Sequence, residues 1–287
     1  MRLALLQHQV ARHEGFAAWQ AAFDARIAEA AAAGADLLAL PEYASMDAIQ
    51  APAASLAAEL AAACDLHDTI LAAMRAAAMR HGIWLLGGSL PVRREGGTAN
   101  HAPLLAPDGR VGFQDKRTMT RFEAEQWGMS PGAPPGVFET PWGRIGVCIC
   151  YDCEFPPLAR AQAEAGAWLL LAPSCTDSRA GFNRVRLSAR ARALENQCFV
   201  AVATTVGDAP WLASLDENHG HAAVFGPVDH GFPEDGVLAR GPMDTPGWLY
   251  ADLDPARLDA ARDGGGVRNH RDYPAAPGRC GVVPLCR

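Results

Sequence analysis

The sequence predicts an α/β protein with a four-layer α-β-β-α sandwich built from two βαβαβ halves. One observation is an internal repeat, because residues 33–42 and 165–174 share Ala, Gly, Ala, Leu, Leu and Pro at matching positions. A second is that short apolar strands alternate with helices around both copies, which favours largely parallel pairing. The third is that these strands are apolar throughout, so both of their faces must be buried. Two sheets, each covered by helices on one face, meet this requirement by packing their other faces together.

The expected elements follow the same order in both halves. The first half contains strand 3–10, helix 14–32, the strand of the first repeat copy, helix 54–81 and strand 83–87. The second half contains strand 144–149, helix 156–165, the strand of the second copy, helix 182–196 and strand 198–202. Helix 14–32 carries Phe16, Trp19, Phe23 and Ile27 on one apolar stripe, which predicts that this face packs against a sheet.

The remaining segments connect or extend the two halves. Residues 99–115 are expected to form a hairpin that turns at the Pro-Asp-Gly-Arg sequence of 107–110. Residues 208–247 are loop-rich, with short strands near 221–226 and 236–240. From about residue 264 the chain is expected to be an extended tail. No linker separates two units, so residues 1–287 are interpreted as a single domain.

The composition excludes several classes of function. The chain has 287 residues, 49% of them hydrophobic, which is enough for a large core. Its formal net charge of −7 and the lack of a long basic block argue against bulk electrostatic binding of nucleic acid. The sequence has no run of 18 consecutive apolar residues, so no membrane span is predicted. The first ten residues are typical of a strand rather than of a signal peptide, so a cytoplasmic location is expected.

The eight cysteines are expected to be free thiols, because no secretory signal accompanies them. Cys148, Cys150 and Cys153 are close enough in sequence to suggest a metal site. A structural zinc site usually needs four ligands, and no second Cys or His pair has a suitable spacing. We therefore expect no metal and no other cofactor. A non-catalytic thiol-binding or metal-binding protein remains the alternative from a different class.

Three residues with complementary chemistry lie just past predicted strands. Cys150 ends an apolar strand and precedes a predicted helix that opens with two prolines, and the positive end of a helix favours a thiolate. Glu42 and Lys116 each follow another predicted strand. Because functional groups collect at the carboxyl ends of strands in α/β sheets, we expect the three side chains to meet. A cysteine can act as nucleophile, a glutamate as base, and a lysine can stabilise an oxyanion.

These segments together resemble the nitrilase superfamily of carbon–nitrogen hydrolases. The matching pieces are Leu40-Pro-Glu-Tyr43, Asp115-Lys116, Cys150-Tyr-Asp152 followed by Phe155-Pro156, and Arg190-Ala-Arg-Ala-Leu-Glu-Asn196. The resemblance runs from the first strand to Asn269-His-Arg-Asp-Tyr273, and the four-layer sandwich of the family agrees with the fold predicted above.

The resemblance implies a role for each matching residue. Cys150 would be the nucleophile and Glu42 the general base, while Lys116 and the backbone N–H of Tyr151 would stabilise the oxyanion. Many members have a second glutamate shortly after the lysine. Residues 118–127 offer Glu123 and Glu125, and Glu125 fits the pattern better because Trp127 follows it by two residues. The alternative is that both glutamates cap a short exposed helix. Cys175 lies at a strand end and is a candidate for lining the substrate-binding cavity.

The resemblance also implies a reaction and an assembly. The expected activity is hydrolysis of a small amide to an acid and ammonia or an amine, through a cysteine thioester. An N-carbamoyl amidohydrolase would use the same residues, and a true nitrilase acting on C≡N is a further alternative. Nitrilases usually carry Trp-Glu after the cysteine, where this chain has Tyr151-Asp152. A homodimer or larger homo-oligomer is expected, since the family commonly pairs its sandwiches.

Overall fold

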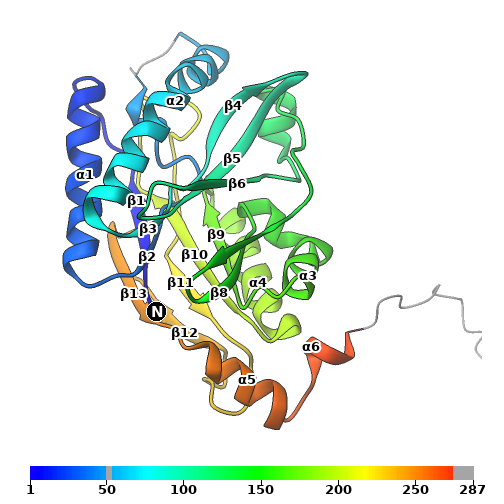
Figure 1. The fold of residues 1–287 in the computed structure, drawn as a ribbon. Helices are drawn as coiled ribbons and strands as arrows, with labels where there is room; N and C mark the ends of the chain where they lie inside the picture. The colour runs from blue at the N-terminus through cyan, green and yellow to red at the C-terminus, as the bar shows by residue number, and fades with distance from the viewer. Residues whose placement is uncertain (50–53, 274–287) are drawn as a thin grey trace, which may run out of the picture.

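The computed structural model describes residues 1–49 and 54–273 (Figure 1). In the first half, the elements are β1 (Arg2–Gln9), α1 (Phe16–Ala32), β2 (Leu37–Ala39), α2 (Leu56–His81) and β3 (Trp84–Leu86). In the second half, they are β8 (Gly143–Val147), α3 (Pro156–Glu164), β9 (Leu169–Ser174), α4 (Arg179–Asn196) and β10 (Phe199–Val206). The repeated order predicted from the sequence is therefore confirmed.

Helices lie on the two outer sides and strands lie between them, with α1 and α2 on one side and α3 and α4 on the other (Figure 1). Alternation along the strands explains this layering. Leu3 and Leu5 of β1 belong to a core that also contains β8, β9 and β10, whereas Ala4 and Leu6 pack under α1 and α2. Successive side chains of a strand point to opposite faces, so each face is buried against a different layer. The predicted four-layer α-β-β-α sandwich is confirmed.

The two halves are joined at β1. This strand pairs in parallel with β2 over Leu3–Leu5 and with β10 over Gln7–Gln9. The hydrogen bonds at the carboxyl end of β1 therefore join the first half to the second. The central strand order is β3-β2-β1-β10-β9-β8. The carboxyl ends of β2 and β9, which lead to the candidate residues Glu42 and Cys175, therefore lie at the same edge of the sheet.

Shorter strands extend the two halves. They are β4 (Leu90–Arg94), β5 (Gly97–Leu105), β6 (Val111–Asp115), β7 (Val137–Thr140), β11 (Ala223–Phe225), β12 (Val237–Arg240) and β13 (Gly247–Asp252). The predicted hairpin is confirmed as β5 and β6, which pair from His101–Asp115 to Leu105–Val111. The strands β4, β7 and β13 were not predicted, because their periodicity is weak; β4 and β7 pair with the strands that follow them, whereas the partner of β13 is distant in sequence. β13 pairs antiparallel with β1 along Arg2–Gln7.

The prediction of an extended tail from residue 264 is wrong for part of that segment. Helix α5 (Pro255–Gly264) precedes it, and helix α6 (Asn269–Asp272) lies within it. Asp254 caps α5 by accepting the backbone N–H of Ala256, and Pro255 occupies the first turn. The side chain of Gln197 accepts the backbone N–H of His270, which attaches α6 to the end of α4. Residues 274–287 lie outside the described part of the chain.

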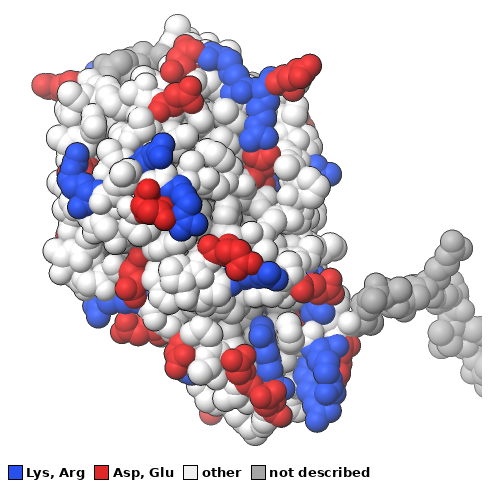
Figure 2. Space-filling model, in the orientation of Figure 1, with Lys and Arg blue, Asp and Glu red and all other residues white. Residues whose placement is uncertain are grey.

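The face of the molecule drawn in Figure 2 has no large patch of one charge. Figure 2 shows basic and acidic side chains interspersed over the face that it presents. In residues 1–49 and 54–273, no helix combines the length and the apolar character that crossing a bilayer requires.

Candidate active site

Glu42 lies in the turn that follows β2. Its side chain is almost fully buried, and its backbone forms a bridge with that of Ser89 after β3. Gly88 permits this approach, since it has φ +75° and a Cβ there would lie 2.1 Å from the carbonyl oxygen of Pro41. The next residue, Tyr43, has φ 58° and is therefore also in the left-handed region. The turn is held tightly enough to keep a strained backbone conformation, which is typical of functional sites.

Lys116 follows β6 directly and is 1% exposed. The loop after it is held by Asp152, whose two carboxylate oxygens accept the backbone N–H groups of Arg117 and Thr118 at 2.9 and 2.7 Å. Because Asp152 is two residues from Cys150, this contact fixes the lysine loop relative to the cysteine turn. In the sequence Asp152 is only part of a motif, and nothing there predicts this positioning contact.

Cys150 begins a short 3₁₀ turn, η3 (Cys150–Glu154), with φ 46°. Its Sγ atom lies 3.5 Å from the carbonyl oxygen of Cys175, which follows β9. The thiol lines the same cavity as the Glu42 carboxylate, whose charge acts on it. A non-glycine residue in the left-handed region is strained, and here the strain turns the sulfur off the strand end toward the other candidate residues.

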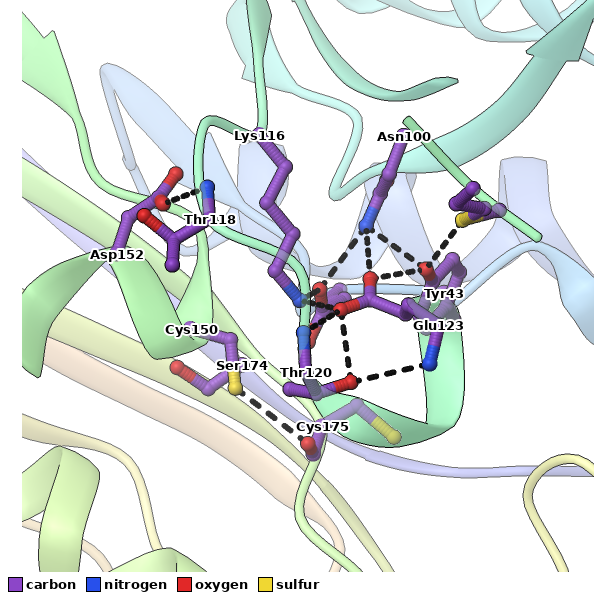
Figure 3. Close-up of polar contacts among 12 residues, drawn as sticks. Tyr43, Asn100, Lys116, Thr118, Thr120, Glu123, Cys150, Asp152, Ser174 and Cys175 are labelled. Atoms are coloured by element: carbon purple, nitrogen blue, oxygen red, sulfur yellow. Dashed lines mark hydrogen bonds and ion pairs between the residues drawn. The ribbon is translucent and has the colours of Figure 1, made fainter. Parts of the chain in front are cut away.

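A buried ion-pair network joins Lys116 to two carboxylates (Figure 3). The Lys116 ammonium donates to Glu42 Oε1 at 2.8 Å and to Glu123 Oε2 at 2.6 Å. Glu123 lies in the short π-helical turn η2 (Phe122–Gln126) and is 2% exposed. An ammonium has three hydrogens, so after these two contacts one remains to meet a substrate oxygen.

The prediction that Glu125 is the buried second carboxylate is wrong, and Glu123 occupies that place. The Glu125 side chain is 53% exposed and pairs with Arg121 one turn earlier, at 2.8 Å. The wider π-helical turn rotates Glu123 inward, where the backbone N–H and hydroxyl of Thr120 each donate to its Oε2 at 2.9 Å. The alternative that both glutamates cap an exposed helix is also wrong.

Two residues of the network were missed from the sequence. Tyr43 donates its hydroxyl to Glu123 Oε1 at 2.6 Å. Asn100, in the middle of β5, donates its side-chain amide to Glu42, Tyr43 and Glu123 at 2.9 to 3.2 Å. Tyr43 adjoins a motif residue, which is a weak signal. Asn100 has no signal in the sequence, because an asparagine inside a strand can be assigned to a site only when the neighbours of that strand are known.

The pKa values of the two carboxylates move in opposite directions. Burial raises the pKa of Glu42 to about 7, against the lowering effect of Lys116. Burial also acts on Glu123, but the Lys116 charge and the hydrogen bonds from Lys116, Tyr43 and Thr120 outweigh it, so its pKa lies below the usual value. Glu123 therefore stays ionised and keeps Lys116 charged, while Glu42 can exchange a proton near neutral pH.

The expectation that a helix N-terminus favours the Cys150 thiolate is wrong. Helix α3 begins only at Pro156, and the pKa of Cys150 is raised well above its usual value, first by burial and then by the Glu42 charge. The resting pair is therefore a thiol beside a carboxylate. The two groups are close enough to titrate together, and a carboxylate beside a thiol is able to accept its proton.

The candidate residues line one cavity of about 540 Å³. Glu42, Lys116 and Cys150 share its wall with Tyr151 and Cys175, and a place on this wall was expected for Cys175 from its position at a strand end. Burial raises the pKa of Cys175 to about 12, so its thiol is suited to packing rather than to attack. The volume fits a small molecule, and the reactive groups converge on it.

The other two cysteines of the cluster point away from this cavity. The Cys148 Sγ contacts Gln162 Oε1 of α3 at 3.2 Å, and the Cys153 Sγ contacts the Cys148 carbonyl oxygen at 3.5 Å. The three sulfurs of the cluster thus have different partners. Within residues 1–49 and 54–273, no group of three or more His, Cys, Asp or Glu side chains is arranged to hold a metal ion.

The sequence model of the carbon-nitrogen hydrolase family matches residues 2–263. The chain belongs to this family. It is 36% identical over 195 residues to the probable hydrolase YhcX of Bacillus subtilis, covering 68% of this chain and 38% of that protein. It is 32% identical over 204 residues to the omega-amidase NIT2 of Xenopus tropicalis, covering 67% of this chain and 69% of that protein. The matched region thus spans little more than a third of the length of YhcX.

The same family relationship holds among solved structures. An amidase from Nesterenkonia sp. AN1 is similar, with a TM-score of 0.72, 27% identity, and coverage of 95% of this chain and 99% of that one. That structure shows a Michael addition of acrylamide at the active-site cysteine. The amidase belongs to the nitrilase superfamily, so the resemblance predicted from the motifs of this carbon–nitrogen hydrolase is confirmed.

Proposed function

We propose that the protein hydrolyses the carbon–nitrogen bond of a small amide, with Cys150 as nucleophile. The observation that carries the proposal is the meeting of Glu42, Lys116, Glu123 and Cys150 around one cavity, in a family whose characterised relatives include amidases. A nucleophile beside a base, with a charged donor at the same point, is what acyl transfer requires.

The proposed reaction proceeds in two halves. The Cys150 sulfur attacks the amide carbon while its proton passes to Glu42. The third hydrogen of the Lys116 ammonium and the backbone N–H of Tyr151 stabilise the oxyanion. The carbon–nitrogen bond then breaks, and the leaving amine takes the proton from Glu42, which leaves a thioester on Cys150. Water attacks the thioester, gives its proton to Glu42 and releases the acid, and the proton returns to the sulfur.

The test is release of ammonia or amine from a panel of small amides, nitriles and N-carbamoyl compounds. We expect turnover of amides in the presence of a chelator. Turnover confined to nitriles would contradict the proposal. Carbon dioxide released together with ammonia would instead identify an N-carbamoyl amidohydrolase. Stoichiometric zinc in a protein that turns over none of these compounds would support the non-catalytic alternative.

The charge of the cavity mouth leads to a prediction about the preferred amide. Both arginines that line the cavity are paired with glutamates, at 2.8 and 3.4 Å. Three lining carboxylates form no ion pair within the described residues: Asp177, Asp216 and Glu217. An amide with a positive charge should therefore have a several-fold higher kcat/KM than an anionic amide of the same length, and salt should reduce the difference. Equal values at low ionic strength would contradict this.

The pH dependence follows from the raised pKa of Glu42, about 7. Below this pH the carboxylate is increasingly protonated and cannot take the Cys150 proton, so kcat/KM should fall about tenfold per pH unit. Above pH 7 it should level off and remain high, because the pKa of Lys116 is raised well above its usual value; burial opposes this shift, but the charges of Glu123 and Glu42 outweigh it. A rising limb near pH 4.5, or a loss of activity between pH 7 and 9, would contradict the assignment of Glu42 as base.

We also propose that the protein forms a homodimer or larger homo-oligomer. Leu187 and Leu194 on α4 are 54% and 41% exposed, and Leu194 lines a groove with Val228 and Val267. We expect light scattering at micromolar concentration to give at least twice the chain mass of 30.4 kDa, with an interface above ~1,000 Å². Replacing both leucines with Asp should yield the monomer. A wild-type mass of 30.4 kDa would refute the proposal.

A further inference from the structure

Asn100 contacts both carboxylates of the candidate site. Its side chain has no exposed surface, and its Nδ2 lies 3.0 Å from Glu42 Oε1, 3.2 Å from Glu123 Oε1 and 2.9 Å from the Tyr43 hydroxyl. Figure 3 shows the amide directed at this group of oxygens from the side opposite Cys150. The contacts come from the middle of β5, which pairs with both β4 and β6.

The orientation of this amide follows from the charges around it. If the group were rotated, its carbonyl oxygen would face two carboxylate oxygens, so the NH₂ group must point toward Glu42 and Glu123. The carbonyl oxygen is then buried and accepts no hydrogen bond within the described residues. Buried polar atoms rarely lack a partner, and one that does calls for an explanation. The explanation here is that the NH₂ group of Asn100 must face the two carboxylates, which leaves its carbonyl oxygen on a side where the described residues offer no donor.

We infer that Asn100 is a positioning residue that keeps Glu42 ionised and aligned for accepting the Cys150 proton. A hydrogen bond donated to a carboxylate favours its charged form. The titratable groups that face Glu42 are Lys116 after β6, Glu123 in η2, Cys150 in η3, Cys175 after β9, and Tyr43. Lys116 favours the anion, whereas the negative charge of Glu123 opposes it.

Asn100 therefore adds a donor without adding a charge. Because the amide does not titrate, its contribution is the same at every pH at which the protein is folded. Removing it should leave Glu42 harder to ionise and should move the whole titration of the Cys150–Glu42 pair upward. This inference rests on the proposed function, since it assigns Asn100 a part in activating the nucleophile.

The experiment measures alkylation of Cys150 by iodoacetamide across about pH 5.5 to 9.5, followed by peptide mass spectrometry, because the thiolate is the reacting form. In the wild-type protein the rate should rise through pH 7. Asn100→Leu removes the donor and keeps a similar side-chain volume. In this variant the midpoint of the rise in alkylation rate should shift to higher pH by about one unit. The rate at pH 6, where Glu42 is mostly protonated in both proteins, would stay close to the wild-type rate. Above pH 8 the rate would level off up to about tenfold higher than in the wild-type protein, because a more basic Glu42 takes the proton from a larger share of the thiol.

Two controls separate positioning from a general structural role. Tyr43→Phe removes a donor to Glu123 but leaves both hydrogen bonds to Glu42 Oε1, so the rise should stay near pH 7. Cys64 on α2, alkylated in the same samples, should respond to pH identically in all variants. A uniform slowing of Cys150 at every pH would overturn the inference, as would an unchanged profile in Asn100→Leu.

A second variant covers the case in which Asn100→Leu does not fold. Asn100→Asp has nearly the same shape and replaces the donor with a third carboxylate, so the rise should move at least as far upward. An unmoved rise in folded Asn100→Asp would also overturn the inference. Since alkylation needs no amide substrate, the result for Asn100 is separate from the result of the substrate panel: an active amidase with an unmoved rise would reject the role of Asn100 alone.

Discussion

Replacing Cys150 with Ala is expected to abolish turnover while leaving the protein folded. The sulfur is the atom that would form the thioester, and no other cysteine on the cavity wall can replace it, because the partly buried Cys175 thiol has a pKa raised to about 12. Loss of a nucleophile costs about 10⁶-fold in kcat in a well-studied hydrolase. The measurement is steady-state ammonia release, with circular dichroism to establish folding.

The matched controls are Cys148→Ala and Cys153→Ala. Both sulfurs lie close to Cys150 in sequence but contact Gln162 and a backbone carbonyl away from the cavity. These variants lose some packing and should keep most of their activity, with a lower melting temperature. Normal turnover by folded Cys150→Ala would reject the proposed mechanism. Loss of activity in all three variants would indicate a structural role for the cluster.

The second large effect is expected at Glu123. Its two oxygens accept hydrogen bonds from Lys116, Tyr43, Asn100 and Thr120. In Glu123→Gln an NH₂ group would face some of these donors, and Lys116 would lose one of its two negative partners. We expect kcat to fall by about 10²-fold, because the oxyanion donor is no longer held in place. Breaking a buried pair should also reduce the free energy of unfolding by about 3 kcal/mol.

Glu125→Gln is the control for this prediction. The two glutamates are two residues apart in one turn, yet the Glu125 side chain is 53% exposed and pairs with Arg121 at the surface. Exposed ion pairs contribute little to stability, so kcat and the melting temperature should both stay close to the wild-type values. Kinetics and thermal denaturation of the two variants, measured side by side, check the assignment. The opposite pattern would mean that Glu125 serves the reaction.

The sequence predicted the fold well where the signals are local. The apolar strands, the stripe on α1 and the repeat at 33–42 and 165–174 all depend on side chains near one another along the chain. Their periodicity determines which faces are buried, and buried faces leave few ways to stack the layers. The weaker strands, such as β13, were missed because their stability comes from pairing with β1, which lies more than 200 residues away.

The candidate site divides in the same way. Glu42, Lys116 and Cys150 could be predicted because each follows a strand and lies in a recognisable motif. The choice between Glu123 and Glu125 was decided by the tertiary structure, since a π-helical turn and the donors of Tyr43, Thr120 and Asn100 determine which carboxylate turns inward. Spacing along a chain cannot predict this when the turn is irregular.

The sequence by itself therefore determined the layers, the family and the three residues that follow strands. The tertiary structure alone decided the second carboxylate, the protonation of the Cys150–Glu42 pair and the contacts of Asn100. The physical reason is that burial and hydrogen-bond partners set a pKa and a side-chain orientation, and both come from elements that meet only in the folded protein.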